Sequence, residues 1–469
     1  MAKEQHGPSE LRIDFLELVT PSITHDLRNG NWVVFNIYED IFKENITADM
    51  MMNDSLNLPF KLPILGQEYL NFEISSKSIE GGDRGTSLFP GPMYVTAITK
   101  RELVKDRQQL YMLHFTSLQD VINNSTTISQ SFRGKRISEI VDTIMREYLD
   151  YDNDIFIEET LGVENIVIPN WKPFKALSWL AQRSINKNEV PNYLFWESNG
   201  ANYFKSVDSI MASNPKQDFV YSPVVEKSQP IKELVKGRTH LSSLKILNQF
   251  NTVRNSLNGL YASKLITHDI VKKEIKQHTF GLDQAYAPSI NHTQGYSGDK
   301  FMPITNEDPG WEMSDRNTFA PQGNGSNEGD NMQSYYDSKV MFHPKHDRMY
   351  AKHPGDEYDN NVEEWKLKRR ALILGLGQVK LQISFPGISY LRAGQIINIV
   401  VPAADRVVEE KPGVPKNPED LIDKFLSGNY MITKLKHTIK WNGGKIAYEM
   451  LAEVVKDALG YPPTYSGVS

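Results

Sequence analysis

Two long alternating segments near the C-terminus constrain the fold more than any other feature of the sequence. They are YMITKLKHTIK (430–440) and KIAYEMLAEVV (445–455), and WNGG joins them. The residues expected on one face of the first segment are Met431, Thr433, Leu435, His437 and Ile439, and those expected on the matching face of the second are Ile446, Tyr448, Met450, Ala452 and Val454. A period of two on either side of Asn442-Gly443-Gly444 predicts a long antiparallel β-hairpin.

Residues 1–115 also have the pattern of β-strands. The alternating residues of WVVFNIYED (32–40) are Val33, Phe35 and Ile37 on one face, and Trp32, Val34 and Tyr38 on the other. YLNFEIS (69–75), MYVTAITK (93–100) and LYMLHFT (110–116) repeat this period of two. Pro59, Pro63 and EGGDRG (80–85) separate the runs. Several short strands with such breaks predict an all-β barrel or sandwich.

The pattern changes to that of helices after residue 115. Ser117 stands at an N-cap position, with Asp120 three residues later. One apolar stripe at helical spacing follows, made of Ile137, Ile140, Val141, Ile144, Met145, Tyr148 and Leu149. A second helix is expected from Pro173, with Leu177, Leu180, Ala181 and Ser184 on one side. Because DIFIEE and NYLFWE between and after these helices read as strands, residues 116–215 predict a mixed α/β domain.

The remainder returns to strands after a long polar stretch. Residues 216–280 contain candidate strands or short helices, whereas 281–361 are rich in Asn, Asp, Gly, Ser, Pro and Tyr. VEEWKLKRRALILGLG (362–377) predicts a helix that ends at Gly375 or Gly377. VKLQISF and QIINIVV then predict strands before the hairpin. The predicted fold class is therefore α+β, mainly β.

Composition sets broad limits on the function. A chain of 469 residues is long enough for two to four domains. Its net charge of −6 gives no general reason to expect a nucleic-acid partner. Cysteine is absent from the sequence, which excludes disulfides, thiolate metal sites and a cysteine nucleophile. Neither a signal peptide nor a membrane-spanning apolar run is expected, so the chain is interpreted as soluble and assembled in a cytoplasm.

The acidic run YLDYDNDIFIEE has part of the pattern of a calcium loop. It places Asp150, Asp152 and Asp154 at alternate positions. Ile155 stands where the loop requires glycine, and Leu161 where it requires glutamate. The same carboxylates could serve sugar hydrolysis, but sequence gives no separation between them. A solvated turn is the preferred interpretation.

A histidine-rich segment offers a possible metal site. FHPKHDRMYAKHPGDE contains His343, His346, Asp347 and His353, but their spacing matches no zinc signature. The preferred interpretation is that these are surface histidines in an interaction loop and not metal ligands. Motifs for a zinc protease, a serine hydrolase or a phosphate loop are missing, and GLGQVK has only two glycines of a dinucleotide fingerprint. The sequence therefore predicts no catalytic, cofactor-binding or metal residues, no cofactor and no enzymatic activity.

An aromatic cluster could be either a sugar platform or a core. IPNWKPFKALSWLAQRS (168–184) holds Trp171, Phe174 and Trp179, and VPNYLFWES adds Tyr193, Phe195 and Trp196. Sugar platforms use exposed tryptophans beside polar groups. Since apolar residues surround these aromatics, the core of the middle domain is favoured, with Trp179 buried against a strand.

An ordered succession of segments resembles the central hub subunit of contractile-tailed, T-even-like phage baseplates. The segments are NIYEDIF, LPILGQEYLNFEIS, YVTAITKRELVKDRQQLYMLHFTSLQDVINNSTTISQSFRGKRISEIVDTIM, IPNWKPFKALSWLAQRS, LNQFNTVRNSLNGLYASKLITHDIVKK, YLRAGQIINIVVPA and LSGNYMITKLKHTI. The resemblance covers most of residues 10–280 and 375–455. No single segment is a sharp motif, and 281–361 has no counterpart.

The resemblance implies a homotrimer whose chains each carry two barrels like those of tail-tube proteins. Such a trimer would form a pseudo-sixfold ring between a trimeric central spike and the hexameric tail tube or its initiator proteins. DNA would pass through the channel without specific binding, baseplate wedge proteins are possible partners, and membrane insertion is not implied. The expected location is the virion tail baseplate, after assembly in the host cytoplasm.

The domains expected on this basis follow the chain in order. They are a first tube-like barrel (1–115), the mixed domain (116–215), a second tube-like barrel (216–280 and 375–455), a loop-rich insertion with a helix (281–374) and a C-terminal tail (456–469). A tail-associated cell-wall-degrading or carbohydrate-binding protein is the alternative function. The sequence leaves open the partner of 281–361 and which residues line the channel or the trimer interface.

Overall fold

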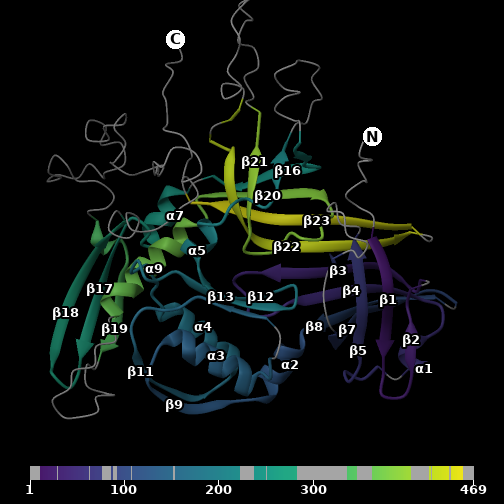
Figure 1. Cartoon of the computed structure of the whole chain (residues 1–469), viewed down its shortest axis with the longest axis horizontal. Helices are drawn as coiled ribbons and strands as arrows, with labels where there is room; N and C mark the ends of the chain where they lie inside the picture. The colour runs from purple at the N-terminus through teal and green to yellow at the C-terminus, as the bar shows by residue number, and fades with distance from the viewer. Residues whose placement is uncertain are drawn as a thin grey trace, which may run out of the picture.

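A computed structural model gives the fold of the chain (Figure 1). It describes residues 11–28, 30–62, 64–76, 86–87, 92–106, 108–151, 154–221, 237–249, 251–282, 335–345, 362–402, 422–423, 425–442 and 445–457. One large sheet occupies the top and right of Figure 1, a mixed lobe lies below it, and a three-stranded sheet with a helix lies at the left.

The first part of the large sheet comes from the N-terminal quarter of the chain and is called the first sheet unit. Its strands are β1 Leu11–Val19, β2 Thr24–Asp26, β3 Trp32–Asp40, β4 Thr47–Asp54, β5 Tyr69–Ser76, β7 Met93–Lys105 and β8 Gln108–Thr116. Their order in space is β3-β4-β8-β7-β5-β1-β2. A short helix, α1 (Leu58–Lys61), follows β4, and β6 (Thr86–Ser87) pairs with β5.

The second sheet unit is built from the C-terminal part of the chain. Its strands are β14 Asp218–Val220, β15 Thr239–His240, β16 Ser243–Asn248, β20 Val379–Pro386, β21 Ile396–Val400, β22 Gly428–Asn442 and β23 Lys445–Lys456. They lie in the order β16-β20-β23-β22-β21-β14-β15. Numbered along the chain within each unit, the strands of both units have the spatial order 3-4-7-6-5-1-2. The fold is therefore an internal repeat, except that β14 runs parallel to its neighbours whereas β1 is antiparallel to its own.

The repeat extends to single residues. In β7 a bulge falls between Val95 and Ala97, and in β22 a bulge falls between Ile432 and Lys434. The bulged residue is a threonine in both strands: the Thr96 hydroxyl donates to the carbonyl of His114, and the Thr433 hydroxyl to the carbonyl of Glu453. The two places in the repeat are therefore equivalent, which puts Tyr94 in register with Met431.

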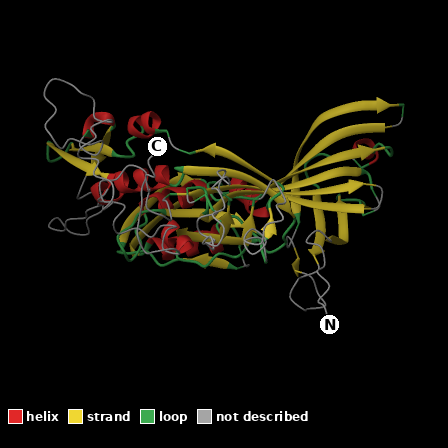
Figure 2. Ribbon diagram, turned by 90° about the horizontal axis from the view of Figure 1, so that it is seen from above, coloured by secondary structure: helices red, strands yellow, loops and turns green. Residues whose placement is uncertain are grey.

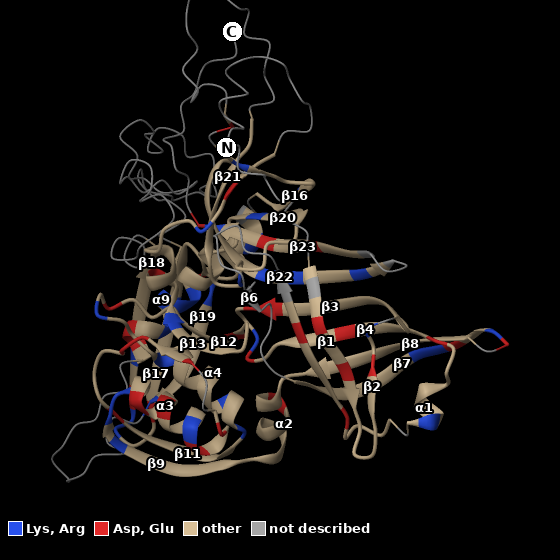
Figure 3. Cartoon of the chain, turned by 45° about the vertical axis from the view of Figure 1, so that its right-hand side comes forward, with Lys and Arg blue, Asp and Glu red and all other residues tan. Residues whose placement is uncertain are grey.

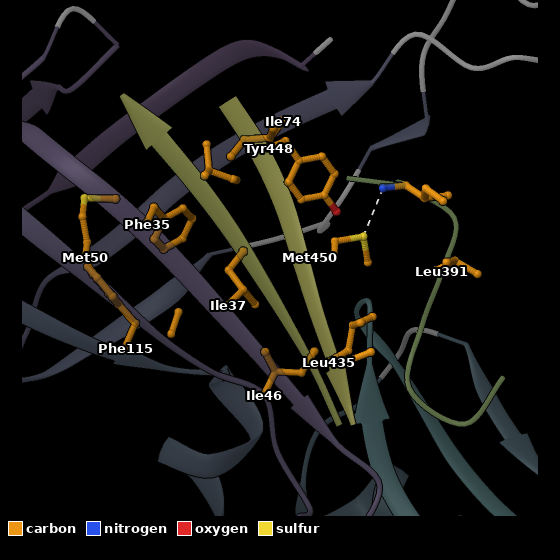
Figure 4. Packing of buried hydrophobic residues seen from close by; sticks show 14 of the residues in the cluster. Phe35, Ile37, Ile46, Met50, Ile74, Phe115, Leu391, Leu435, Tyr448 and Met450 are labelled. Carbon is orange, nitrogen blue, oxygen red and sulfur yellow. Dashed lines mark hydrogen bonds between the residues drawn. The ribbon is translucent and has the colours of Figure 1, made fainter. Parts of the chain in front are cut away.

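The two units join along β22. Its residues 428–431 pair with β21, and on the same edge its residues 434–440 pair with β3 of the first unit. Beneath the junction, side chains of both units form one continuous hydrophobic core. Figure 4 shows Phe35, Met50 and Phe115 of the first unit beside Leu435 and Tyr448 of the second. Seen from above, long strands extend from the body to one side (Figure 2).

The mixed lobe lies between the two units in sequence. Its strands are β9 Ile128–Lys135, β10 Ile155–Ile157, β11 Glu164–Trp171, β12 Tyr193–Ser198 and β13 Ala201–Ser206, and its helices are α2 Leu118–Ser125, α3 Ile137–Tyr148, α4 Pro173–Arg183 and α5 Val207–Met211. The predicted stripe of α3 is buried, except for the partly buried Tyr148, as is the predicted side of α4. Ser117 is the N-cap of α2, and Pro173 opens α4. The predictions for these helices are confirmed.

A third lobe combines a small sheet with helix α9 (Val362–Gly375). Its strands are β17 Ala262–Asp269, β18 Glu274–Gly281 and β19 Val340–Lys345, accompanied by α7 Thr252–Leu257 and η4 Tyr336–Ser338. The sequence prediction grouped residues 216–280 into one barrel. The structure corrects this for β17 and β18, because they pair with each other and with β19 instead of joining the large sheet.

The described residues form a mainly β, α+β fold, as predicted, with α9 ending at Gly375. The predicted hairpin is confirmed as β22 and β23, whose pairing reaches Asn442 opposite Lys445. Two face assignments were wrong. Met431 was expected on the same face as Leu435, but the two pack in different core clusters. Val33 was expected on the same face as Phe35, but Val33 is exposed, and Trp32 is buried with Phe35 instead. Each error arises at a bulge, because one extra residue turns the following side chains to the other face.

No described helix has the length and apolar character needed to cross a membrane.

Candidate functional site

The surface of the large sheet that faces away from its core is the candidate site, and it is called the polar face. It runs across eight strands in the order β16-β20-β23-β22-β3-β4-β8-β7. Because side chains alternate along a strand, the residues between the core positions all point to this face. On β22, for example, Leu435 and Ile439 are fully buried, whereas Lys434 and Lys440 are exposed.

Hydrogen bonds link the polar side chains from strand to strand across this face. The contacts are Ser243–Ser384 (2.6 Å), Lys380–Glu453 (3.2 Å), Lys440–Glu449 (2.6 Å), Thr438–Asn36 (3.1 Å), Asn36–Asp49 (2.7 Å), Tyr38–Asp49 (2.6 Å) and Thr99–His114 (2.8 Å). Burial and the bond to Asp49 raise the pKa of Tyr38, so its hydroxyl stays protonated and donates. Such pairs hold the side chains in place and stabilise the sheet.

Charges of both signs alternate on the polar face. Its lysines include Lys245, Lys380, Lys434, Lys436 and Lys440, and its carboxylates include Asp40, Asp49, Glu102, Glu449 and Glu453. Figure 3 shows blue and red side by side on β22 and β23. Because Lys380 and Lys434 share Glu453, and Lys440 pairs with Glu449, much of the positive charge is neutralised locally. The face is therefore extended and polar without a strong field of either sign.

Two buried carboxylates fasten the mixed lobe to the large sheet. Glu39 on β3 accepts hydrogen bonds from the Ser198 hydroxyl (2.7 Å) and the Ala393 N–H (2.8 Å). Glu197 on β12 accepts from the Ile46 N–H (3.1 Å) in the loop after β3. Glu39 thus binds β12, and Glu197 binds the loop that follows β3, so the two lobes are held together at two points.

The two carboxylates differ in charge. Burial would raise the pKa of Glu39, but His437, Arg392 and the Ala393 N–H outweigh it and lower that pKa, so Glu39 is ionised. Burial lowers the pKa of His437, whose Nδ1 lies 2.7 Å from the Tyr448 hydroxyl. For Glu197, burial dominates and raises the pKa to about 7.

The acidic run does not form a metal site among the described residues. Asp150 and Asp154 are both exposed, and the carbonyl of Asp154 accepts from the Asn202 N–H. Asp152 lies outside the described residues. No group of three or more His, Cys, Asp or Glu side chains suited to a metal occurs in the part of the chain that the structure describes.

Of the predicted histidine group, only His343 is described. It lies on β19, and its Nδ1 is 2.9 Å from Lys366 Nζ on α9. Burial, with Lys366 and Arg183 nearby, lowers the pKa of His343 to about 4, so the ring is neutral at physiological pH. Its Nδ1 lone pair accepts from the lysine. His346, Asp347 and His353 lie outside the described residues.

The aromatic cluster divides between core and surface. Phe174, Tyr193 and Phe195 belong to the core of the mixed lobe, and Trp196 is buried on the opposite side of β12. Trp171 and Trp179 are only partly buried and meet edge to face at 5.3 Å. The expectation that Trp179 is a buried core residue is therefore wrong.

Cations already cover these two tryptophans. Lys175 Nζ lies 4.7 Å from the ring centre of Trp171, and the Arg183 guanidinium 4.4 Å from that of Trp179. Arg183 is held in turn by Glu164 at 3.2 Å. A sugar needs an open ring face, so this geometry does not favour the carbohydrate-binding alternative.

Sequence reasoning missed the polar face and the repeat that builds it. The available signal was short: YVTAIT (94–99) and MITKLK (431–436) place a threonine in the same frame. Only Gly91 and Gly428, five residues before the threonines, extend the match, so the equivalence becomes visible mainly through the hydrogen bonds.

Comparison with known proteins gives similarities only at the level of structure. No protein-family model and no curated protein sequence matches the chain. A tail protein from Neisseria meningitidis MC58 has 9% identity and a TM-score of 0.52, with 94% of this chain and 96% of that chain covered. The 43 kDa tail protein of prophage MuSo2 from Shewanella oneidensis has 10% identity and a TM-score of 0.49, covering 95% and 99%. An Escherichia coli component of the type VI secretion system has 10% identity and a TM-score of 0.39, covering 97% and 79%. At such low identity the first comparison shows the fold alone: this chain shares the fold of a tail protein over nearly the whole length of both.

Proposed function

We propose that this chain is the structural hub of a contractile phage tail baseplate. Three copies would form a ring with pseudo-sixfold symmetry, because each chain supplies two sheet units with the same strand order. The ring would join a trimeric central spike to the hexameric tail tube and line the DNA channel. The internal repeat is the observation that carries this proposal, and the shared fold with a tail protein supports it.

The dimensions of the polar face suit a channel. Three copies with eight strands each would supply 24 strands. With strands about 4.8 Å apart and tilted by about 40°, such a ring is roughly 45 to 50 Å across at the backbone. That width accommodates a DNA duplex. The balanced charges of the polar face would let DNA pass without the lysine–phosphate pairing that causes non-specific binding.

Further features of the assembly follow from this role. Each sheet unit would close as one of two tube-like barrels, with the mixed lobe between them and the third lobe as part of the insertion. Its partners in the virion baseplate would be a spike protein, tube or tube-initiator proteins, and wedge proteins. The assembly would form in the host cytoplasm. The role requires no catalytic group and no cofactor.

Light scattering of the purified chain tests the proposal. We expect a mass of three chains, and electron microscopy should show rings with six similar lobes around a pore. A protein that stays monomeric at every concentration, or that releases sugar from peptidoglycan, would contradict the hub role. DNA retention on a gel at moderate salt would contradict the channel assignment for the polar face.

A further inference from the structure

The edge of β7 lacks the neighbour that its equivalent strand has. Strand β22 pairs with β21 through 428–431 and with β3 through 434–440. In the repeat, β7 pairs with β5 only through Met93 and Tyr94. Among the described strands, none pairs with residues 97–105 on that edge. At the other end of the polar face, β20 is the one partner of β16 within the part of the chain that the structure describes.

Burial differs sharply between equivalent positions of the two units. A second bulge in β7, between Thr99 and Glu102, makes Leu103 the counterpart of Ile439. Ile439 is fully buried beside β3, whereas Leu103 is 70% exposed. Ile37 on β3 is fully buried, whereas Ile246, its counterpart on β16, is 43% exposed. Apolar side chains are therefore exposed at the two edges where the repeat leaves a strand without a neighbour, and this marks an interaction surface.

We propose that β7 of one copy pairs antiparallel with β16 of a second copy, and so reproduces between chains the junction that β22 and β3 form within one chain. The proposal rests on the hub function and names the surface through which its copies meet. A second copy fits because the two free edges are complementary halves of a junction that this sequence already forms. Head-to-tail pairing of this kind closes a ring when the rotation from one copy to the next closes, as the proposed trimer requires.

The repeat also fixes the register. Thr438 lies opposite Asn36 in the junction within the chain. On β23, Glu449 lies four residues before Glu453 and pairs with Thr438. On β8, Leu110 lies four residues before His114, the equivalent of Glu453, and pairs with Glu102. Glu102 is therefore the counterpart of Thr438. Asn36 pairs with Asp49 on β4, and Lys245 pairs with Gln382 at the equivalent place on β20. Lys245 is therefore the counterpart of Asn36. Glu102 of one copy is thus expected directly opposite Lys245 of the next, as an ion pair.

A cysteine pair tests this register in a chain that has no native cysteine. Glu102→Cys combined with Lys245→Cys is expected to give covalent dimers and trimers on a denaturing gel after mild oxidation. The matched control is Asn36→Cys with Thr438→Cys, which should close within one chain and leave the mass unchanged. Lys105→Cys with Lys245→Cys, displaced by two positions in the register, should cross-link far less.

The outcomes separate the pairing from the hub function. A native trimer by light scattering without a cross-link at Glu102 and Lys245 overturns the pairing and leaves the hub role standing. A ladder that continues beyond three chains supports the pairing and overturns the closed trimer. A protein that remains monomeric and does not cross-link overturns both.

Charge reversal gives a second readout that needs no oxidation. Lys245→Glu should weaken the trimer, because like charges would face each other at each junction. The protein concentration below which trimers dissociate should rise about tenfold. Adding Glu102→Lys to the same chain should restore assembly. Trimers of the Lys245→Glu variant that are as stable as those of the parent would overturn the register.

Discussion

At the residue scale, the buried carboxylates distinguish this fold from a simple hydrophobic assembly. Glu39 is kept ionised by partners on three segments, whereas Glu197 has the Ile46 N–H and an environment that favours the neutral acid. A carboxyl group that is neutral near pH 7 costs less to bury than an ionised one. The joint between the large sheet and the mixed lobe is therefore sensitive to pH.

Replacing Glu197 with glutamine should remove this sensitivity. The folded chain binds a proton at Glu197 up to about pH 7, and the unfolded chain only up to its usual pKa of 4.5. This contribution to stability is therefore fully present below pH 4.5 and is lost as the pH rises through about 7. We expect Glu197→Gln to match the parent at pH 4 and to be more stable by about 3 kcal/mol at pH 8. Urea unfolding at both pH values measures this, with exposed Glu147→Gln as the control; equal pH dependence in parent and Glu197→Gln would contradict it.

The two classes of tryptophan should respond differently to truncation. Trp196 is 2% exposed and stacks on Tyr203, while Gly394 approaches its ring so closely that a Cβ there would lie 2.7 Å away. Trp196→Ala should cost about 3 to 5 kcal/mol of unfolding free energy. Partly buried Trp179 should cost about 1 to 2 kcal/mol when replaced by alanine, through lost contacts with Trp171 and Arg183. Chemical denaturation of both variants checks the order, and equal losses would argue against the assignment of Trp179 to the surface.

At the element scale, the hairpin β22–β23 organises the molecule because several segments pack on it. The loop after β20 returns across β23: the Gly387 N–H donates to the Tyr448 carbonyl, and the Ile388 N–H contacts Met450 Sδ at 3.0 Å. The absence of a side chain at residue 387 permits this approach. The hairpin is thus held by its own connections as well as by neighbouring strands.

Gly387→Ala tests the fit of this loop. A Cβ at this position would lie 1.8 Å from Tyr448 Cδ1, and the ring is buried and bonded to His437, so it has little freedom to move. We expect a loss of about 2 to 4 kcal/mol. Gly377→Ala is the matched control, since its nearest atom would be 3.8 Å away, and its change should stay within about 0.5 kcal/mol. Thermal melts that place both variants at the same midpoint would refute the close contact.

At the scale of the whole molecule, one sheet and one core unite segments that are hundreds of residues apart. Strand β22 has partners along both edges, from β21, β23 and β3, whereas β18 is paired on one edge among the described strands. The central part of the polar face should therefore open only with global unfolding, and edge strands such as β18 should open locally.

Hydrogen exchange should follow this hierarchy. Amides of β22 between 434 and 440 are expected to exchange slowest. Those of β18 between 274 and 279 should exchange faster, because β18 is paired on one edge among the described strands and most of its side chains there are exposed. Mass spectrometry of peptides from the chain at neutral pH measures both. Similar rates for the two strands would contradict the expected difference in stability between the large sheet and the edge strand β18.

The sequence by itself determined the elements that depend on near neighbours. Helices α3 and α4 and the β22–β23 hairpin were predictable because a period of 3.6 or 2, a suitable residue at the helix start and a glycine turn act within a few residues. The mainly β fold class followed from the same local signals. The family resemblance added an expected role, but no residue that lines a surface.

Only the tertiary structure decided which strands are neighbours and which side chains face outward. The bulges at Thr96 and Thr433 turn the residues on their two sides to opposite faces of the sheet. Strand pairing also shows that Thr96 and Thr433 occupy equivalent positions in the repeat. The burial of Glu39 and Glu197, the cations over Trp171 and Trp179, and the free edges of β7 and β16 arise from contacts between distant segments. No local pattern encodes such contacts, because the free energy that selects them comes from packing the whole core.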